Sequence, residues 1–268
     1  MAAPPLTVFT PFYKNIRYFD ECIKSVLSQS YGDFEYLMVN DGDPAEAARI
    51  ERTYNDRRIR ILNASPPLGL SGSRQFGLQQ ARGALIAFID SDDFCEPDRL
   101  RKQIDFLTGN PDHVLVGGAL RYVNDRSETI GHRLYPETDE EIKSRMVVVN
   151  CVAQPAVMAR RQALIDCGGY TDEFPCAEDY ALWLRLARFG KFHNLQDELS
   201  AYRIHEESGK WLLLKPALRD TARLKIKAIR EYGFRPTPRA LLSIAAHAAL
   251  LPLPASVVHW IFRRMFVA

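Results

Sequence analysis

The chain has 268 residues, 47% of them hydrophobic and 25% charged, and a formal net charge of +2. This length allows one large α/β domain, or a domain with an appendage. We find no low-complexity tract or internal repeat. The five cysteines are odd in number and lack CxxC spacing, which argues against a disulfide framework or a zinc site and indicates a reducing compartment. No signal peptide is evident, so we expect the main domain in the cytosol.

The charge is distributed unevenly along the chain. Eight basic and two acidic residues lie between Lys215 and Arg239. With Arg263 and Arg264 the tail reaches +8, which leaves −6 for residues 1–214. A mildly acidic body with a basic tail suggests an anionic surface as partner. Nucleic acid is the weaker candidate, because aromatic residues occur only near the end of the basic stretch.

The first half of the chain alternates strand and helix signals. Apolar runs predict strands at 6–10, 34–40, 59–62 and 84–89. Phe19, Ile23, Val26 and Leu27 have helical spacing. A second helix is predicted over 71–81 with Ser71 as N-cap, and a third from Pro97, a residue suited to the first helical position. Strands alternating with helices predict an α/β fold with a mostly parallel sheet and right-handed crossovers.

The second half is less regular. It predicts a strand from Val114, a charged helix over 139–146, a short segment at 156–159, an amphipathic helix over 177–189, a strand over 198–204 and then a basic amphipathic helix. Residues 240–262 contain no Asp, Glu, Lys or Arg. This uncharged segment is long enough to span a membrane. Because Pro252 and Pro254 interrupt it, we expect two short apolar helices at a membrane interface. Packing on the domain and a true span are the alternatives.

The most informative feature is the apolar run 84–89, which ends in Asp90, Ser91, Asp92 and Asp93. Three carboxylates this close repel one another, so they need a counter-cation or strongly donating backbone. The end of a buried strand is also where open α/β sheets place their ligand crevice. The cluster therefore predicts a divalent metal that carries a phosphorylated ligand.

These features resemble glycosyltransferase family 2, the inverting nucleotide-sugar enzymes with the GT-A fold. The resemblance covers roughly residues 6 to 210 and depends on the joint order of several stretches. They are TVFTPFY at 7–13, SVLSQSY at 25–31, VNDG at 39–42, GLSGSR at 69–74, FIDSDD at 88–93, GGY at 168–170 and EDYALWLRL at 178–186.

The resemblance implies a nucleotide site formed by Thr10, Pro11 and Asp41, with the aspartate accepting the imide N–H of uracil. Tyr13 can supply an apolar face for the base. Arg74 follows a glycine-rich loop, a place where a cation and backbone N–H groups can face a diphosphate. The family commonly has Ala-Arg-Asn where this chain has Ser-Arg-Gln. The alternatives are a turn carboxylate for Asp41 and a solvated surface arginine for Arg74.

In the family, Asp90 and Asp92 form the Asp-x-Asp motif that holds Mg²⁺ or Mn²⁺ against the donor phosphates. The metal then acts as a Lewis acid for the leaving group. Asp93 is expected to support the motif or approach the sugar. His205 lies in a segment that resembles one near the diphosphate and metal, so metal or phosphate binding competes with an ordinary structural role.

Inversion requires a base that takes the proton of the acceptor hydroxyl. By resemblance that base is Asp179, with Glu178 as a substitute base or a positioning residue. Both carboxylates also suit a helix N-terminus for purely structural reasons. The Gln-x-x-Arg-Trp motif and multiple spans of processive family members are not visible, which favours addition of a single sugar.

We therefore predict a GT-A domain at 1–211 and a basic, apolar helical extension at 212–268 that contacts the inner face of the cell membrane. The enzyme is expected to be a metal-dependent hexosyl- or N-acetylhexosaminyltransferase. The expected donor is a nucleotide sugar, namely a UDP-sugar, and the expected acceptor is a glycan or lipid-linked molecule in cell-surface polysaccharide assembly. A metal-dependent phosphohydrolase and a non-catalytic nucleotide-sugar binder on the same scaffold are the rival hypotheses.

Overall fold

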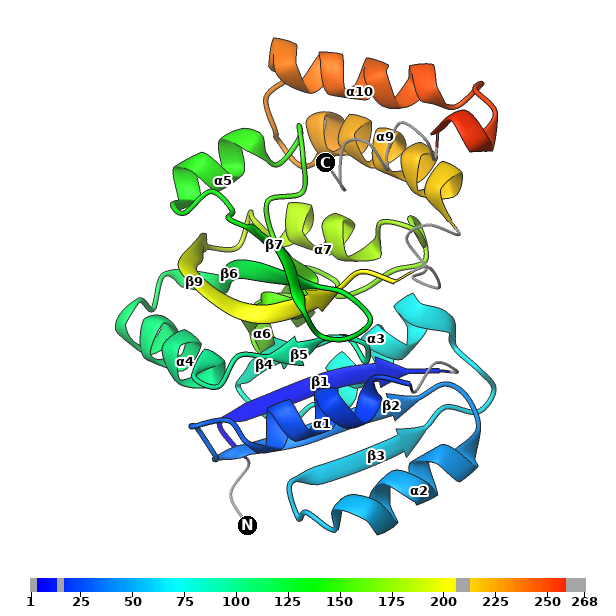
Figure 1. Ribbon diagram of the computed structural model, residues 1–268. Coiled ribbons are helices and arrows are strands. Elements are labelled where there is room, and N and C mark those ends of the chain that lie inside the picture. Colours follow the sequence, from blue (N-terminus) through cyan, green and yellow to red (C-terminus); the bar gives the residue numbers. More distant parts are fainter. Residues whose placement is uncertain (1–3, 14–16, 206–212, 259–268) are drawn as a thin grey trace.

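The computed structural model describes residues 4–13, 17–205 and 213–258 (Figure 1). In that part of the chain the strands form one nine-stranded sheet in the order β3-β2-β1-β4-β8-β6-β9-β5, with β7 paired to β6. The strands are β1 Leu6–Phe12, β2 Phe34–Asn40, β3 Ile59–Asn63, β4 Leu85–Phe88, β5 Phe94–Cys95, β6 His113–Val123, β7 Thr129–Arg133, β8 Met158–Arg160 and β9 Lys191–Arg203.

The sheet changes character along its width. Strands β3, β2, β1 and β4 are all parallel. Beyond them β8 runs antiparallel to both β4 and β6, while β6 and β9 are parallel to each other. This arrangement confirms the α/β fold class. It also places the ends of β1, β2 and β4 at one edge, where the polar motifs of the first half begin.

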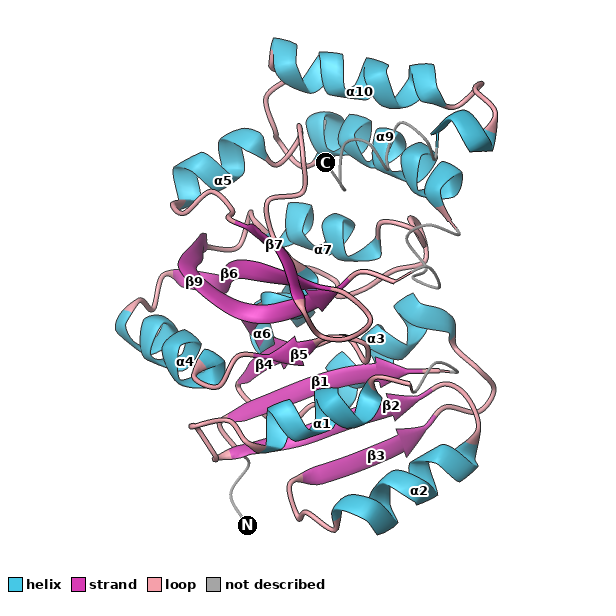
Figure 2. Ribbon diagram, viewed as in Figure 1, coloured by secondary structure: helices cyan, strands magenta, loops and turns pink. Residues whose placement is uncertain are grey.

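Helices cover both faces of the sheet (Figure 2). They are α1 Phe19–Leu27, α2 Pro44–Tyr54, α3 Gly69–Gln80, α4 Arg99–Gly109, α5 Asp139–Arg145, α6 Arg161–Asp166, α7 Glu178–Leu186, α9 Leu214–Glu231 and α10 Pro238–Leu250, with the short 3₁₀ helix η1 at Gln154–Ala156.

The alternation of side chains along the central strands explains the two layers of helices. In β2, Tyr36 and Met38 face the core that contains α1, α2 and α4. Leu37 and Val39 face the opposite core, with α3, α5, α6, α7 and α9. Successive strand residues point to opposite sides of a sheet, and all of β2 is buried. A continuous apolar run therefore serves a strand covered on both faces.

Most elements expected from the sequence are present, with bounds that differ by a few residues. The sequence interpretation did not identify α2, β5 or β7, and it began β9 at 198 instead of 191. The expected N-cap of α3, Ser71, is wrong, because that helix already begins at Gly69. The third helix begins at Arg99, not at Pro97.

The C-terminal helices α9 and α10 pack against each other above α7 (Figure 1). Leu224 and Ala228 of α9, together with Ala240 of α10, belong to the same core as the central strands. Among the described residues, none of the helices combines the length and hydrophobicity that crossing a bilayer requires. The remainder of the expected apolar segment, residues 259–262, lies outside the described residues.

Candidate active site

The carboxyl ends of three neighbouring strands bring the polar motifs together. Phe9 of β1 is in register with Phe88 of β4, and Ile89 donates a backbone hydrogen bond of 3.1 Å to Phe9. On the other side of β1, the amide of Asp41 donates to the carbonyl of Phe12 at 2.9 Å. Asp41 and Asp90 therefore follow their strands at the same edge of the sheet, on either side of β1.

Asp41 connects this edge to the start of α3. Its buried carboxylate accepts the amide protons of Leu68 at 2.6 Å and Gly69 at 2.8 Å. Amides at a helix start have no partner within the helix, and Gly69 adopts a φ of +71° that favours glycine. A distant carboxylate thus supplies the capping that we assigned locally to Ser71.

Of the other three nucleotide-site candidates, Thr10 and Pro11 lie in β1 and Tyr13 follows its last residue. The hydroxyl of Thr10 is 3.2 Å from that of Tyr36, and both side chains are buried in the core beneath α1. Only the backbone of Thr10 can therefore face a ligand. Pro11 is half-buried. Tyr13 is 51% exposed, and a Cβ atom on Gly42 would lie 2.6 Å from its carbonyl oxygen, so the turn after β2 and Tyr13 are in close contact.

Arg74 of α3 joins the two carboxylate motifs. Its guanidinium donates to Asp90 at 2.7 Å and, through the other terminal nitrogen, to Glu178. Arg74 is only 4% exposed, so the surface alternative is wrong. Its Nε is buried without a hydrogen-bond partner among the described residues. The arginine that we expected opposite a diphosphate therefore ties the end of β4 to the start of α7.

Burial is the largest influence on the pKa values of Glu178 and Asp90, the two acids that contact Arg74. It raises the pKa of Glu178 to about 7, although the positive charge of Arg74 acts in the opposite direction. The pKa of Asp90 is also raised, first by burial and then by the negative charge of Asp92, again against Arg74. Both acids are therefore sensitive to the cation between them.

Asp92 and Asp93 have different partners. Asp92 Oδ2 lies 3.0 Å from Nε2 of His205. Asp93 is 1% exposed, and its Oδ1 accepts the amide of Arg203 at 2.8 Å. Its other oxygen is buried without a hydrogen-bond partner in the described part of the chain. Burial and the charges of the two neighbouring aspartates hold the pKa of Asp93 well above its usual range.

This donor set fits a divalent cation that is shared with a ligand. In residues 4–13, 17–205 and 213–258, no three His, Cys, Asp or Glu side chains form a group that could hold a metal ion unaided. Mg²⁺ typically takes only one or two carboxylates and completes its shell with water and phosphate oxygens. The adjacent Asp92 and His205, with Asp90 two residues from Asp92, supply donors of the right chemistry.

Asp179 lies beside Glu178 at the start of α7. It is half-buried, and its Oδ1 accepts the amide proton of Tyr180 at 2.6 Å. Burial raises its pKa, while Arg74 and the backbone amides lower it. The N-terminal end of a helix favours a carboxylate, so α7 presents two acids, of which Arg74 contacts Glu178.

The sequence interpretation missed the role of Arg203. Its guanidinium donates to the carbonyls of Asp92 at 3.0 Å and Asn124 at 2.8 Å, and to Glu21. It also lies 4.1 Å from the centre of the Tyr18 ring. The side chain is fully buried and holds the backbone beneath the aspartate cluster. No local pattern marks it, because these partners come from three separate segments, around Tyr18 and Glu21, at Asp92 and at Asn124.

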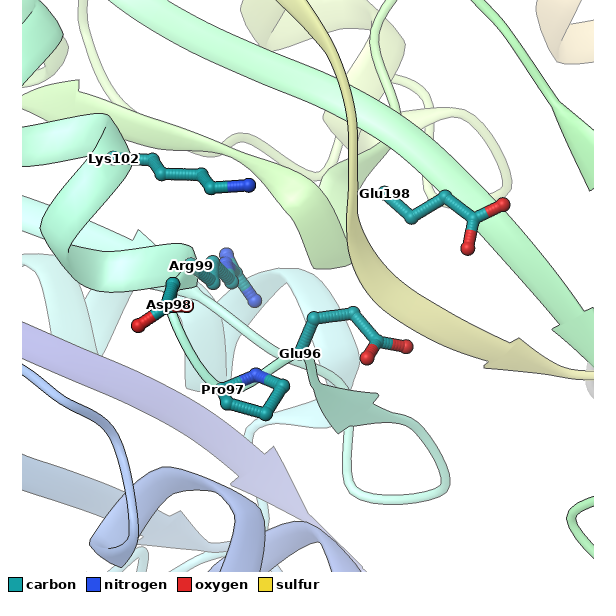
Figure 3. Close-up of a pocket in the computed structure, with 6 residues that line it drawn as sticks. All are labelled: Glu96, Pro97, Asp98, Arg99, Lys102 and Glu198. Carbon is teal, nitrogen blue, oxygen red and sulfur yellow. The ribbon is translucent and has the colours of Figure 1, made fainter.

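A hollow between the start of α4 and β9 lies away from these residues (Figure 3). Its volume is about 240 Å³, below the usual range for ligand pockets. Two of the charged side chains that line it form ion pairs with residues outside the lining, Lys102 with Asp197 and Glu96 with Arg121. None of the predicted site residues lines it, so the candidate site is the edge described above.

A sheet of this topology, with an aspartate cluster after β4 and an acidic pair at the start of α7, defines a GT-A α/β transferase fold. The family model "Glycosyl transferase family 2" matches residues 7–168, and the chain belongs to this family. It is 32% identical over 208 residues to the O-antigen biosynthesis glycosyltransferase WbnJ of Escherichia coli, covering 76% of this chain and 81% of WbnJ. The chain is also 26% identical to the amylovoran biosynthesis glycosyltransferase AmsE of Erwinia amylovora, and the match covers 91% of this chain and 92% of AmsE.

Solved structures confirm the fold. TarS 1–349 of S. aureus in complex with UDP-GlcNAc has a TM-score of 0.62 at 17% identity, over 87% of this chain and 74% of that one. The mannosyltransferase PcManGT of Pyrobaculum calidifontis in complex with GDP-Man and Mn²⁺ has a TM-score of 0.67 at 16% identity, over 99% and 81%. The protein is thus a glycosyltransferase.

Proposed function

We propose that this enzyme transfers one sugar, with inversion, from a nucleotide sugar to a hydroxyl group of a glycan or lipid-linked acceptor. The observation that carries the proposal is the pair of contacts made by Arg74 with Asp90 and Glu178. A single displacement at the anomeric carbon needs two groups close together: one that stabilises the leaving group and a base that takes the proton of the attacking hydroxyl. Arg74 joins the acid cluster suited to the first task to the acid pair suited to the second.

In this proposal Asp179 takes the proton of the attacking hydroxyl. Glu178 is the less suitable base, because Arg74 occupies it in a buried ion pair. Its role is to fix Arg74, and through Arg74 the position of Asp90. Asp92, His205 and Asp90 are the residues to hold Mg²⁺ or Mn²⁺, which would supply Lewis-acid stabilisation of the departing nucleoside diphosphate.

The proposed donor is a UDP-sugar of the hexose or N-acetylhexosamine type. Asp41 has two carboxylate oxygens with about four acceptor sites, so its two backbone contacts leave room for an imide N–H. Tyr13, exposed beside Gly42, can pack on the base. The complexes of TarS with UDP-GlcNAc and of PcManGT with GDP-Man support a nucleotide sugar. The names of WbnJ and AmsE support an acceptor in surface polysaccharide assembly.

The decisive test is thermal-shift and calorimetric titration with a panel of nucleotides and nucleotide sugars, with and without Mn²⁺. We expect Mn²⁺-dependent stabilisation by UDP and one UDP-sugar, which is lost in Asp92→Ala and kept in Asp105→Ala, a matched change on the exposed side of α4. Stabilisation by a different nucleotide would change the donor only. No response to any nucleotide would contradict the proposal.

Turnover separates the rival activities. Asp179→Asn is expected to bind donor normally and to lose sugar transfer. Unchanged turnover in this variant would contradict the assignment of the base. Metal-dependent hydrolysis of simple phosphate esters without sugar transfer would instead favour a phosphohydrolase.

The proposal includes a peripheral contact of α10 with an anionic membrane at the cytosolic face. Leu241 and Leu242 are 53% and 71% exposed, and the nearby Arg235 and Arg239 are also exposed. Such a surface can insert leucines while the arginines meet lipid phosphates. In vesicle flotation, Leu241→Glu with Leu242→Glu should abolish binding to anionic vesicles. Ile130→Glu, at a residue 55% exposed on β7, is the control, and equal flotation of the variants would refute the contact.

A further inference from the structure

Helix α9 contacts the turn that precedes the acid pair of α7. Asp220 of α9 is 0% exposed, and its Oδ2 accepts the amide proton of Cys176 at 3.3 Å. Cys176 lies two residues before Glu178, and the turn closes through a 2.9 Å hydrogen bond from the Ala177 amide to the Phe174 carbonyl. A buried carboxylate from the C-terminal region thus holds the backbone that leads into the site.

Two further residues of the same turn, Glu173 and Phe174, also contact α9. Glu173 forms an ion pair with Lys227 through both of its oxygens, at 2.6 and 2.7 Å. Phe174 is 2% exposed and shares a core with Leu224 of α9. The guanidinium of Arg223 lies 5.5 Å from the centre of the Phe174 ring. The turn is therefore attached to α9 at Glu173, Phe174 and Cys176.

Stability does not explain why Asp220 is buried, because burying its carboxylate costs free energy. Its neighbouring cations are Arg219 at 3.4 Å and Arg223 at 3.8 Å, whose side chains are 59% and 57% exposed. Contacts with such exposed arginines contribute little to stability, whereas removing a carboxylate from water is expensive. An apolar residue could fill the same space without that cost. The carboxylate is explained by the backbone amide that it holds.

We propose that Asp220 is a positioning residue for the acid pair, and that α9 forms the outer wall of the acceptor side of the site. This inference rests on the proposed function of Asp179. The C-terminal region then has two tasks: α10 meets the membrane and α9 fixes the base. Removal of residues 212–268 would abolish turnover even with a soluble acceptor, because the turn at 173–177 would lose its support.

The test compares Asp220→Ala and Asp220→Asn in the full chain. Asparagine retains an oxygen that can accept the Cys176 amide, whereas alanine does not. We expect Asp220→Ala to lower kcat about tenfold to a hundredfold, with donor affinity unchanged within about twofold by calorimetry, and Asp220→Asn to restore most of the rate. Asp197→Ala, which removes an exposed carboxylate paired with Lys102, is the matched control and should be neutral.

A folded Asp220→Ala with unchanged kcat would overturn the inference, as would a loss of donor affinity equal to the loss of rate. If Asp220→Ala does not fold, Lys227→Met decides. It removes the ion pairs of Lys227 with Glu173 and, within α9, with Glu231, and the contact of its ammonium group with the Phe174 ring. Because Glu173 and Phe174 belong to the turn, kcat should fall about twofold to threefold, and an unchanged kcat refutes the inference. The Asp179→Asn background separates the two proposals. In that background Asp220→Ala should lower the residual rate of Asp179→Asn no further. Full turnover of Asp179→Asn alone would contradict the proposed base, but not the contacts of α9 with the turn at 173–177.

Discussion

Replacing Arg74 by methionine removes the cation between two buried acids. The Arg74 side chain is 5% exposed and contacts Asp90 at 2.7 Å as well as Glu178. Methionine fills a similar volume but leaves both carboxylates without a charged partner. Removing one member of a buried ion pair typically costs about 3–5 kcal/mol. We therefore expect Arg74→Met to lower the free energy of unfolding by about that amount at pH 8, and to abolish sugar transfer.

The cost should depend on pH. In the wild type, burial already raises the pKa of Glu178 to about 7, and it also raises that of Asp90, while Arg74 opposes both shifts. Without Arg74 both pKa values rise further, so the folded variant binds protons that the unfolded chain has released. The folded state then gains stability as the pH falls. The penalty is expected to be largest at pH 8 and to shrink towards pH 5.

Urea unfolding at pH 8 and pH 5 measures this penalty through the transition midpoint and slope. Arg49→Met is the matched control, because Arg49 also contacts two carboxylates, Glu46 at 2.8 Å and Asp20 at 3.4 Å. Its side chain is 33% exposed, so we expect a cost of about 0–1 kcal/mol. The reasoning is refuted if Arg74→Met costs no more than Arg49→Met at pH 8, or if its cost is the same at both pH values.

Two further predictions concern the same part of the fold. Because the pKa of Glu178 is raised from 4.5 to about 7, its proton stabilises the folded state at low pH, and this stability is lost as the pH rises from about 4.5 to 7. Glu178→Gln should remove up to about 3 kcal/mol of that pH dependence from urea-derived unfolding free energies, and parallel curves would contradict this. A Cβ atom on Gly77 would lie 2.2 Å from the Phe9 ring, so Gly77→Ala should cost about 1–3 kcal/mol. Gly32→Ala, with no atom within 4 Å, should leave the urea midpoint unchanged, and equal midpoints for both variants would disprove the close packing.

The sequence predicts the parallel half of the sheet well because each element there carries its own pattern. Strand β2 was expected at 34–40 and is found at Phe34–Asn40. In helix α1, Phe19, Ile23 and Val26 are buried as predicted, whereas Leu27 is half-buried. In contrast, α2 has only two buried residues, Ala47 and Ile50, so its apolar stripe is too narrow to stand out. The two-residue strand β5 has no periodicity to detect and is defined by its pairing with β9.

The start of α3 illustrates a different limit. A local pattern favours Ser71 as the N-cap, since serine often caps a helix. In the fold the amides of Leu68 and Gly69 instead bond to Asp41, which lies 27 and 28 positions earlier in the chain. The helix therefore begins two residues earlier than the pattern suggests. Only the tertiary structure brings that acceptor to the helix, so no propensity within the segment could have indicated it.

The aspartate cluster shows how far the chemical prediction reached. The sequence requires compensation for three neighbouring carboxylates, and the structure assigns a different partner to each. Asp90 contacts Arg74, Asp92 lies 3.0 Å from His205, and Asp93 accepts the amide of Arg203 at 2.8 Å. All three partners are buried, but only at Asp92 are both members of the pair, a carboxylate and an imidazole, groups that ligate divalent cations. We therefore propose Asp92 as the main carboxylate ligand of the cation, since the contacts that join Asp90 to the acid pair of α7 can then remain in place.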